Sequence, residues 1–184
     1  MRMKFIAVVA PMLAGAALLP IPAFSAGDGG SGGGGETVQQ CRNGEVWDKQ
    51  KQKCVPPKQG MIDDDSLYEA GRDLAMAGRY GEAITVLSLA ADKSDPRILN
   101  YLGYSHRKMG RVLVGLGYYQ EALKLSPDYT QARQYMGEAY LQMGDLAGAE
   151  RQLGEIEQRC GRGCTDFTHL QAQIDAYKAG ERSI

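Results

Sequence analysis

A spacing of 32 to 34 residues recurs in three columns of small residues, and it constrains the fold more than any other feature of the chain. Gly71, Gly103 and Gly137 are separated by 32 and 34 residues. The same two separations relate two further columns, which are Gly78, Gly110 and Gly144, and Ala83, Gly115 and Ala149. Each period holds two helical stretches. The pattern therefore predicts a helix–turn–helix solenoid in which each unit buries its apolar face against the next unit.

The first 25 residues have the composition of a secretory signal peptide. Arg2 and Lys4 precede an apolar run from residue 5 to residue 19, and Ala23 and Ser25 occupy the small-residue positions before a cleavage site. Three prolines keep the run shorter than the roughly 20 apolar residues that a membrane span needs. We therefore expect residues 1–25 to be a signal peptide, with a periplasmic or secreted product and no stable membrane insertion after cleavage.

Residues 26–40 are rich in glycine and predict a flexible linker without a core. The whole chain has 21 basic and 22 acidic residues, a formal net charge of −1. Proteins that bind nucleic acid by its phosphates need a basic surface, which this balance does not supply. We therefore expect no nucleic-acid partner.

Four cysteines in an exported chain indicate two disulfides, which can be connected in three ways. Because the cysteines of each pair are close in sequence, local pairing is favoured, Cys41 with Cys54 and Cys160 with Cys164. An alternative makes the second pair metal ligands together with His169, or a redox pair. Two thiolates and one imidazole are too few for a closed zinc site, and the spacing is not that of C-x-x-C, so a structural disulfide is favoured and no metal is expected.

Residues 41–60 predict a small disulfide-closed hairpin followed by a linker. The dipeptide Asn43-Gly44 is a turn signal, and closing a loop of this length by a disulfide contributes about 3 kcal/mol. The spacing resembles the central stretch of a type-2 (peritrophin-like) chitin-binding module at Cys41, Gly44, Trp47, Asp48 and Cys54. That resemblance implies that Trp47 stacks on a sugar ring. Separately, the positive charge of the nearby lysines suits an anionic surface such as cell-wall polymer, the alternative being a solvated run. In the alternative interpretation Trp47 covers the disulfide.

Residues 61–159 resemble three tetratricopeptide repeats, at 64–95, 96–129 and 130–159. The signature columns hold Leu67, Ala70, Gly71, Leu74, Tyr80, Ala83, Leu87 and Ala90; then Leu99, Leu102, Gly103, His106, Val112, Gly115, Tyr119, Ala122 and Pro127; then Arg133, Met136, Gly137, Tyr140, Leu146, Ala149, Leu153 and Ile156. The resemblance implies an all-α fold. Residues 160–184 then form a Cys-closed turn, a capping helix over 165–179 and a tail, with apolar residues on one face of that helix.

The resemblance also implies where a ligand lies. In tetratricopeptide repeat proteins the first helix of each pair lines a concave groove, and the matching positions are Tyr68, Arg72, Met76, Asn100, Tyr104, Arg107, Lys108, Gln134, Glu138 and Gln142. Some family members hold a peptide's terminal carboxylate in a clamp of Lys, Asn and Arg. The clamp positions here are Tyr68, Arg72, Tyr101, Gln131 and Tyr135, so that type of ligand is not implied.

Catalytic motifs are absent from the sequence: it has two histidines, no phosphate-binding glycine loop after a strand and no G-x-S-x-G elbow. We therefore expect no enzyme activity and no cofactor. The sequence predicts an exported adaptor that binds a protein or peptide in its groove. The alternative is a carbohydrate- or cell-wall-binding protein that uses the Trp47 hairpin, with the repeats as its scaffold.

Overall fold

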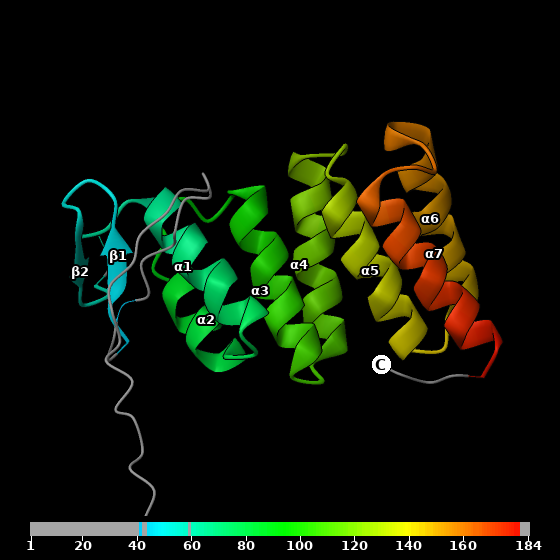
Figure 1. Cartoon of the computed structure of the whole chain (residues 1–184), viewed down its shortest axis with the longest axis horizontal. Helices are drawn as coiled ribbons and strands as arrows, with labels where there is room; N and C mark the ends of the chain where they lie inside the picture. Colours follow the sequence, from blue (N-terminus) through cyan, green and yellow to red (C-terminus); the bar gives the residue numbers. More distant parts are fainter. Residues whose placement is uncertain (1–40, 42–43, 59, 181–184) are drawn as a thin grey trace, which may run out of the picture. The chain divides into compact units, whose positions relative to one another are not determined.

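The structure is a computed structural model of the 184-residue chain, and it describes residues 41, 44–58 and 60–180. The expected signal peptide (1–25), the glycine-rich linker (26–40) and residues 181–184 lie outside the described residues. The described part is helical apart from one small hairpin (Figure 1). None of its helices is both long and apolar enough to cross a membrane.

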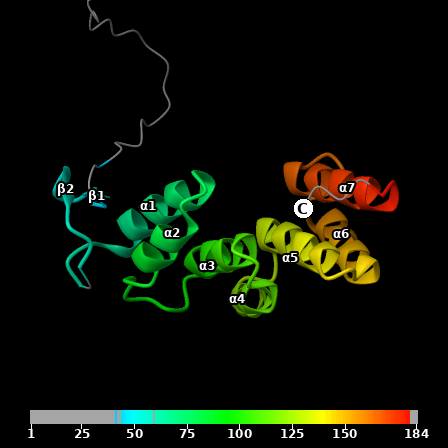
Figure 2. The same cartoon turned by 90° about the horizontal axis from the view of Figure 1, so that it is seen from below.

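Seven helices follow the hairpin, and they pack as three pairs and a last single helix. Consecutive helices contact each other throughout (Figures 1 and 2). The helices are α1 (Asp64–Met76), α2 (Tyr80–Leu87), α3 (Pro96–Lys108), α4 (Val112–Leu125), α5 (Thr130–Gln142), α6 (Leu146–Cys160) and α7 (Thr165–Lys178). This confirms the expected all-α fold of three repeats and a capping helix.

The helix ends follow from the local sequence. The Asp63 carboxylate accepts a hydrogen bond from the Ser66 backbone N–H at 2.9 Å and so caps α1. At the start of α3, the Asp95 carboxylate caps the helix and Pro96 occupies its first turn. Gly78, Gly110 and Gly144 end the turn after each first helix with φ of 77°, 80° and 79°, a conformation that favours glycine.

Close contacts between helices occur at the glycine column within the first helices, which holds Gly71, Gly103 and Gly137. A Cβ atom on Gly103 would lie 2.7 Å from Cε1 of Tyr119 and 3.0 Å from the backbone oxygen of Gly115, both on α4. On Gly71 it would overlap Leu87 of α2. The Gly137 contact differs: a Cβ there would lie 2.6 Å from a methyl group of Leu170, so this glycine makes room for α7 rather than for the second helix of its own repeat.

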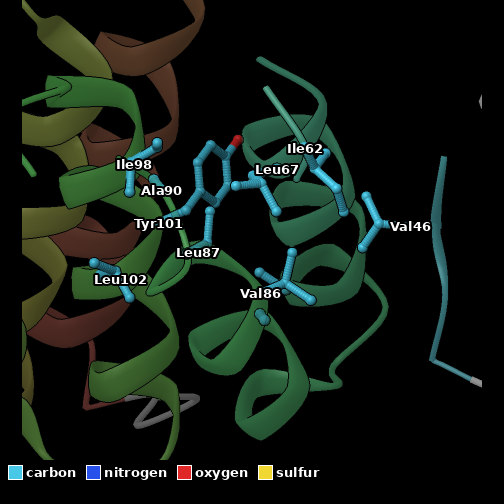
Figure 3. Close-up of a cluster of buried hydrophobic side chains, with 11 residues drawn as sticks. Val46, Ile62, Leu67, Val86, Leu87, Ala90, Ile98, Tyr101 and Leu102 are labelled. Carbon is cyan, nitrogen blue, oxygen red and sulfur yellow. The ribbon is translucent and has the colours of Figure 1, made fainter. Parts of the chain in front are cut away.

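The hairpin covers the start of the helical array. Its strands β1 (Val46–Asp48) and β2 (Lys53–Val55) are antiparallel, with Trp47 opposite Cys54. The chain reverses between them at residues 49–52, and Gly44, just before β1, lies in a turn with φ of 73°. Val46 is buried in one cluster with Ile62 and Leu67, so the hairpin packs on α1 (Figure 3).

Both predicted disulfides are present. One joins Cys41 to Cys54 and closes the hairpin, and the other joins Cys160 to Cys164 across the turn between α6 and α7. After the second disulfide, Phe167, Leu170 and Ile174 of α7 are buried against α5 and α6. The opposite face of α7 is exposed and polar, which is the arrangement that ends a solenoid in water.

Candidate functional site

The residues expected to line the groove all lie on the three first helices. Within the described chain, α1 contacts α3 and α3 contacts α5, whereas the second helices α2, α4 and α6 make no contact with one another. The first helices are therefore the closely spaced side of the array. We call the side chains that α1, α3 and α5 present there the first-helix face; those at least partly open to solvent are Tyr68, Arg72, Met76, Tyr104, Lys108, Glu138 and Gln142.

A continuous row of tyrosine rings links the three repeats on this face. Tyr101 lies 5.9 Å from Tyr68 and 6.2 Å from Tyr104, measured between ring centroids. Tyr104 in turn lies 4.8 Å from Tyr135. Tyr80 extends the row at 6.2 Å from Tyr104. Such tilted and edge-on contacts favour aromatic pairs by about 0.5–1.5 kcal/mol beyond the burial of their area.

Tyr104 is the ring of this row best placed for a ligand. Tyr101 and Tyr135 are only 4% and 8% exposed, whereas Tyr104 is half-buried and lies on the middle repeat. Burial raises the pKa of the Tyr104 and Tyr135 hydroxyls, so both keep their protons at neutral pH. The face therefore offers a neutral aromatic surface with hydroxyl groups.

Arg107 lies behind this row instead of facing solvent. The residue is 2% exposed, and its guanidinium forms an ion pair with Glu138 at 2.7 Å and donates to the Tyr119 hydroxyl at 3.3 Å. It also lies 5.4 Å from the Tyr104 ring centroid. Burial acts to lower the pKa of Arg107, but Tyr119 and Glu138 outweigh it and raise the pKa, so the charge persists. Arg107 holds two repeats together and positions Tyr104.

Two more of the expected groove residues are also buried. The Asn100 side-chain amide donates to the Tyr129 hydroxyl at 3.3 Å and to Oε1 of Gln131 at 3.2 Å, so it ties α3 to the start of α5. Gln134 donates to Oε1 of Glu138 at 3.0 Å. These contacts leave Asn100 and Gln134 as supports for the face, because little of either side chain is accessible to a ligand.

The accessible part of the face combines aromatic, apolar and charged groups. Arg72 pairs with Asp73 at 3.0 Å and lies 5.7 Å from the Tyr68 ring centroid. Met76, at 60% exposure, and Lys108 are exposed to solvent. Arg72 and Glu138 are thus paired within the chain, whereas Lys108 forms no ion pair with a described residue, and Tyr68 and Tyr104 are the main open aromatic anchors of the face.

Sequence reasoning missed Tyr101 and Tyr135 as parts of the row. Their 34-residue separation equals the repeat period, and this recurrence was the signal that could have identified them. Tyr80, on α2, also joins the row although its helix is not a first helix. A ring on a second helix cannot be assigned to this face from periodicity alone.

The hairpin and the two histidines have fewer features of a binding site than the first-helix face. Trp47 is half-buried and lies opposite Cys54 of the disulfide, the geometry expected if it covers that bond. His106 stacks on Tyr118 at 5.4 Å, and burial lowers its pKa. His169 is exposed on α7. Among the described residues, no three His, Cys, Asp or Glu side chains come together as a metal site.

Comparison with known proteins agrees with this architecture. Residues 107–174 match the sequence profile of the Tetratricopeptide repeat family. No curated protein sequence matches the chain. Several solved structures share the fold at low sequence identity.

Three of these solved structures show the extent of the similarity. The first tetratricopeptide repeat domain of Spaghetti (RPAP3), bound to an HSP90 peptide, is 20% identical with a TM-score of 0.55, over 64% of this chain and 94% of that one. The type III secretion translocator chaperone SycD of Yersinia enterocolitica is 22% identical with a TM-score of 0.55, over 65% and 88%. PcrH in complex with the chaperone binding region of PopD is 22% identical with a TM-score of 0.56, over 67% and 98%. The described chain therefore has the fold of tetratricopeptide repeat domains, with three helix pairs followed by the single helix α7, and residues 107–174 match the sequence profile of that family.

Proposed function

We propose that this protein is a non-enzymatic adaptor that binds an extended segment of another protein on its first-helix face. The observation that carries the proposal is the tyrosine row, which runs without a break across all three repeats. Aromatic rings held rigidly at the centre of an interface are the residues that most often dominate binding energy. Three solved structures of similar fold are complexes with an HSP90 peptide, a peptide of the translocator YopD and a region of PopD.

The chemistry of the face favours an internal segment over a chain terminus. A free carboxylate is best held by several unpaired cations, but Arg72 and Arg107 are each paired with a carboxylate of this chain, and Lys108 is the one cation of the face without an ion pair to a described residue. Tyrosine rings and hydroxyls instead suit apolar side chains and the peptide backbone. The expected ligand is a neutral, extended segment with apolar or aromatic side chains.

We also propose that the protein acts outside the cytoplasm, in the periplasm or after secretion. Two disulfides within the described chain support this location, because such bonds persist in oxidising compartments. The signal-peptide pattern of residues 1–25 points the same way. Neither disulfide includes a residue of the first-helix face: one closes the hairpin before α1 and the other closes the turn between α6 and α7.

A random-sequence peptide library displayed on phage, selected on the mature chain, tests the binding proposal. The affinity of a selected peptide is then measured by calorimetry for wild type and variants. Tyr104→Ala should lose about 2 kcal/mol, roughly thirtyfold in Kd, as truncation of a binding hot spot does. Tyr118→Ala, a matched change of a partly buried tyrosine on α4, should leave the affinity unchanged.

Trp47→Ala separates the adaptor from the carbohydrate- and cell-wall-binding alternative. It should have no effect on peptide affinity if the ligand lies on the first helices. A protein that selects no peptide but binds cell-wall polymer through Trp47 would disprove the adaptor proposal. So would a selected peptide that binds equally well after Tyr104→Ala in a correctly folded variant.

A further inference from the structure

The two main open rings of the first-helix face each lie beside an arginine of α3. Arg107 lies 5.4 Å from the Tyr104 ring centroid, and the guanidinium of Arg97 lies 4.8 Å from the Tyr68 ring centroid. Both distances are within the range at which a guanidinium is attracted to an aromatic ring. Because Tyr68 belongs to α1, the contact with Arg97 crosses the junction between the first and second repeats.

The guanidinium of Arg97 is held in place by two carboxylates. Its Nη2 lies 2.7 Å from Oδ1 of Asp65 on α1 and 2.6 Å from Oδ2 of Asp95. The Asp95 carboxylate also accepts from the Arg97 backbone N–H at 2.8 Å, in its role as the cap of α3. Backbone and side chain of Arg97 are thus tied to one residue, and the second carboxylate ties the guanidinium to the helix that carries Tyr68.

Neither the repeat nor the helix accounts for an arginine at this position. The position one repeat earlier holds Asp65 and the position one repeat later holds Gln131, so a cation is not part of the repeat pattern. A cation in the first turn of a helix also lies at the positive end of the helix dipole, which is unfavourable. The contacts that explain Arg97 are therefore those that it makes across the junction, with Asp65 and Tyr68.

Arg97 differs from Arg107 in its exposure to solvent. The Arg97 side chain is 44% exposed and that of its partner Asp65 is 64% exposed, whereas the Arg107 side chain is 1% exposed. Exposed ion pairs contribute little to the free energy of unfolding. Arg97 therefore adds little to the cohesion of the two repeats, and its main effect is on the orientation of the Tyr68 ring.

The separation of the two open rings limits the ligand. Tyr101 lies 5.9 Å from Tyr68 and 6.2 Å from Tyr104, so the centroids of the two open rings are at most about 12 Å apart. Tyr101 itself is 4% exposed. An extended chain advances about 3.3 Å per residue. Ligand side chains that lie on Tyr68 and on Tyr104 are therefore two to four residues apart.

We propose that Arg97 is a positioning residue of the ligand site, and that it holds the Tyr68 ring as a second anchor beside Tyr104. The segment that binds carries two apolar or aromatic side chains, two to four residues apart. This inference rests on the proposed function, to which it adds a second anchor and a spacing in the ligand.

Nuclear magnetic resonance of the mature chain with labelled tyrosine rings tests the positioning role without a ligand. Arg97→Gln should shift the ring signals of Tyr68 and speed the flips of that ring, and should leave the Tyr104 signals unchanged. Arg162→Gln, the matched change of an exposed arginine paired with Glu157, should alter neither set of signals. Unchanged Tyr68 signals in Arg97→Gln overturn the positioning role.

Calorimetry with a peptide selected on the wild-type chain tests the second anchor. Tyr68→Ala should weaken binding about tenfold or more, and Arg97→Gln about two- to fivefold. Arg97→Gln should add no further loss to Tyr68→Ala, because Arg97 acts through that ring. Alanine at one of the two apolar positions of the peptide should weaken binding to wild type but not to Tyr68→Ala.

The outcomes separate this inference from the proposed function. If Tyr104→Ala weakens binding while Tyr68→Ala and Arg97→Gln do not, the proposed function stands and the second anchor is overturned. Equal losses from Arg97→Gln with and without the Tyr68 ring also overturn it. A chain that binds no peptide overturns both. Should Arg97→Gln fail to fold, Asp65→Asn, which removes one of the two ion pairs, repeats each measurement.

Discussion

The interface between the first and second repeats differs in chemistry from the interface between the second and third. The buried contacts of the first are apolar: Leu87 of α2 packs with Ile98 and Leu102 of α3 in one cluster, and the Arg97–Asp65 ion pair that also joins these repeats is exposed. The second also contains buried polar links, namely the Arg107–Glu138 ion pair and the Asn100–Gln131 hydrogen bond. Two neighbouring junctions of one solenoid are thus held together by different kinds of contact.

The two kinds of contact lead us to expect different responses of the two junctions to substitution. Apolar contacts are non-directional, so the first junction can lose a methyl group and partly repack. A buried ion pair is directional, and removal of one partner leaves the other charged and desolvated. We expect the second junction to determine the register of the array, and hence the placement of Tyr104 and Tyr135, while the first contributes burial.

The largest loss of stability is expected when one partner of the Arg107–Glu138 ion pair is removed. Arg107→Ala leaves Glu138 and the Tyr119 hydroxyl without their partner and should cost about 3–5 kcal/mol. Urea unfolding monitored by circular dichroism measures this loss. Replacing both partners, Arg107→Met with Glu138→Met, should cost less than Arg107→Ala alone. If the double variant is the less stable of the two, the directional account of this junction is wrong.

A smaller loss of stability is expected when the negative charge of this ion pair is removed without a change in the shape of the side chain. Glu138→Gln keeps a hydrogen-bond acceptor near Arg107 but removes the negative charge, and should cost about 2 kcal/mol. Hydrogen exchange should show faster opening of α5 than of α1 in this variant, because only the second junction is weakened. Equal acceleration in both helices would contradict the division into two junctions.

The smallest effect is expected at the apolar junction. Ile98→Val removes one methylene group from the cluster that α3 shares with α2 and should cost about 1 kcal/mol. No polar group loses a partner, so the loss should not depend on salt concentration. A cost above that of Glu138→Gln in the same urea titration would reverse the ranking of the junctions.

Much of the fold could be predicted from the sequence, because the residues that recur in each repeat are ones that only a particular backbone geometry accommodates. The turn glycines Gly78, Gly110 and Gly144 mark the ends of the first helices, and all three have the left-handed conformation expected there. Asp95 and Pro96 mark the start of α3 in the same way. Such positions depend on local backbone geometry, which a sequence pattern records directly.

The site was harder to predict, because it depends on how the repeats pack. Periodicity places Asn100, Arg107 and Gln134 on first helices but does not tell whether a side chain faces solvent or the next repeat. In the structure all three are buried: Asn100 and Arg107 bond to residues of α5, and Gln134 bonds to Glu138 of its own helix. The partner of Gly137 was missed for the same reason, since it lies on α7, outside the repeat.

The hairpin on α1 has a consequence for assembly. An uncovered end of a solenoid is a surface on which the opposite end of another molecule can stack, and repeated stacking produces filaments. Val46 and Ile62 occupy that surface on α1, and the Cys41–Cys54 bond holds the strands of the hairpin together. Reduction of this bond would therefore do more than loosen a small β-structure: it would weaken the cover over the apolar end of the array at α1, while the polar outer face of α7 keeps the other end closed.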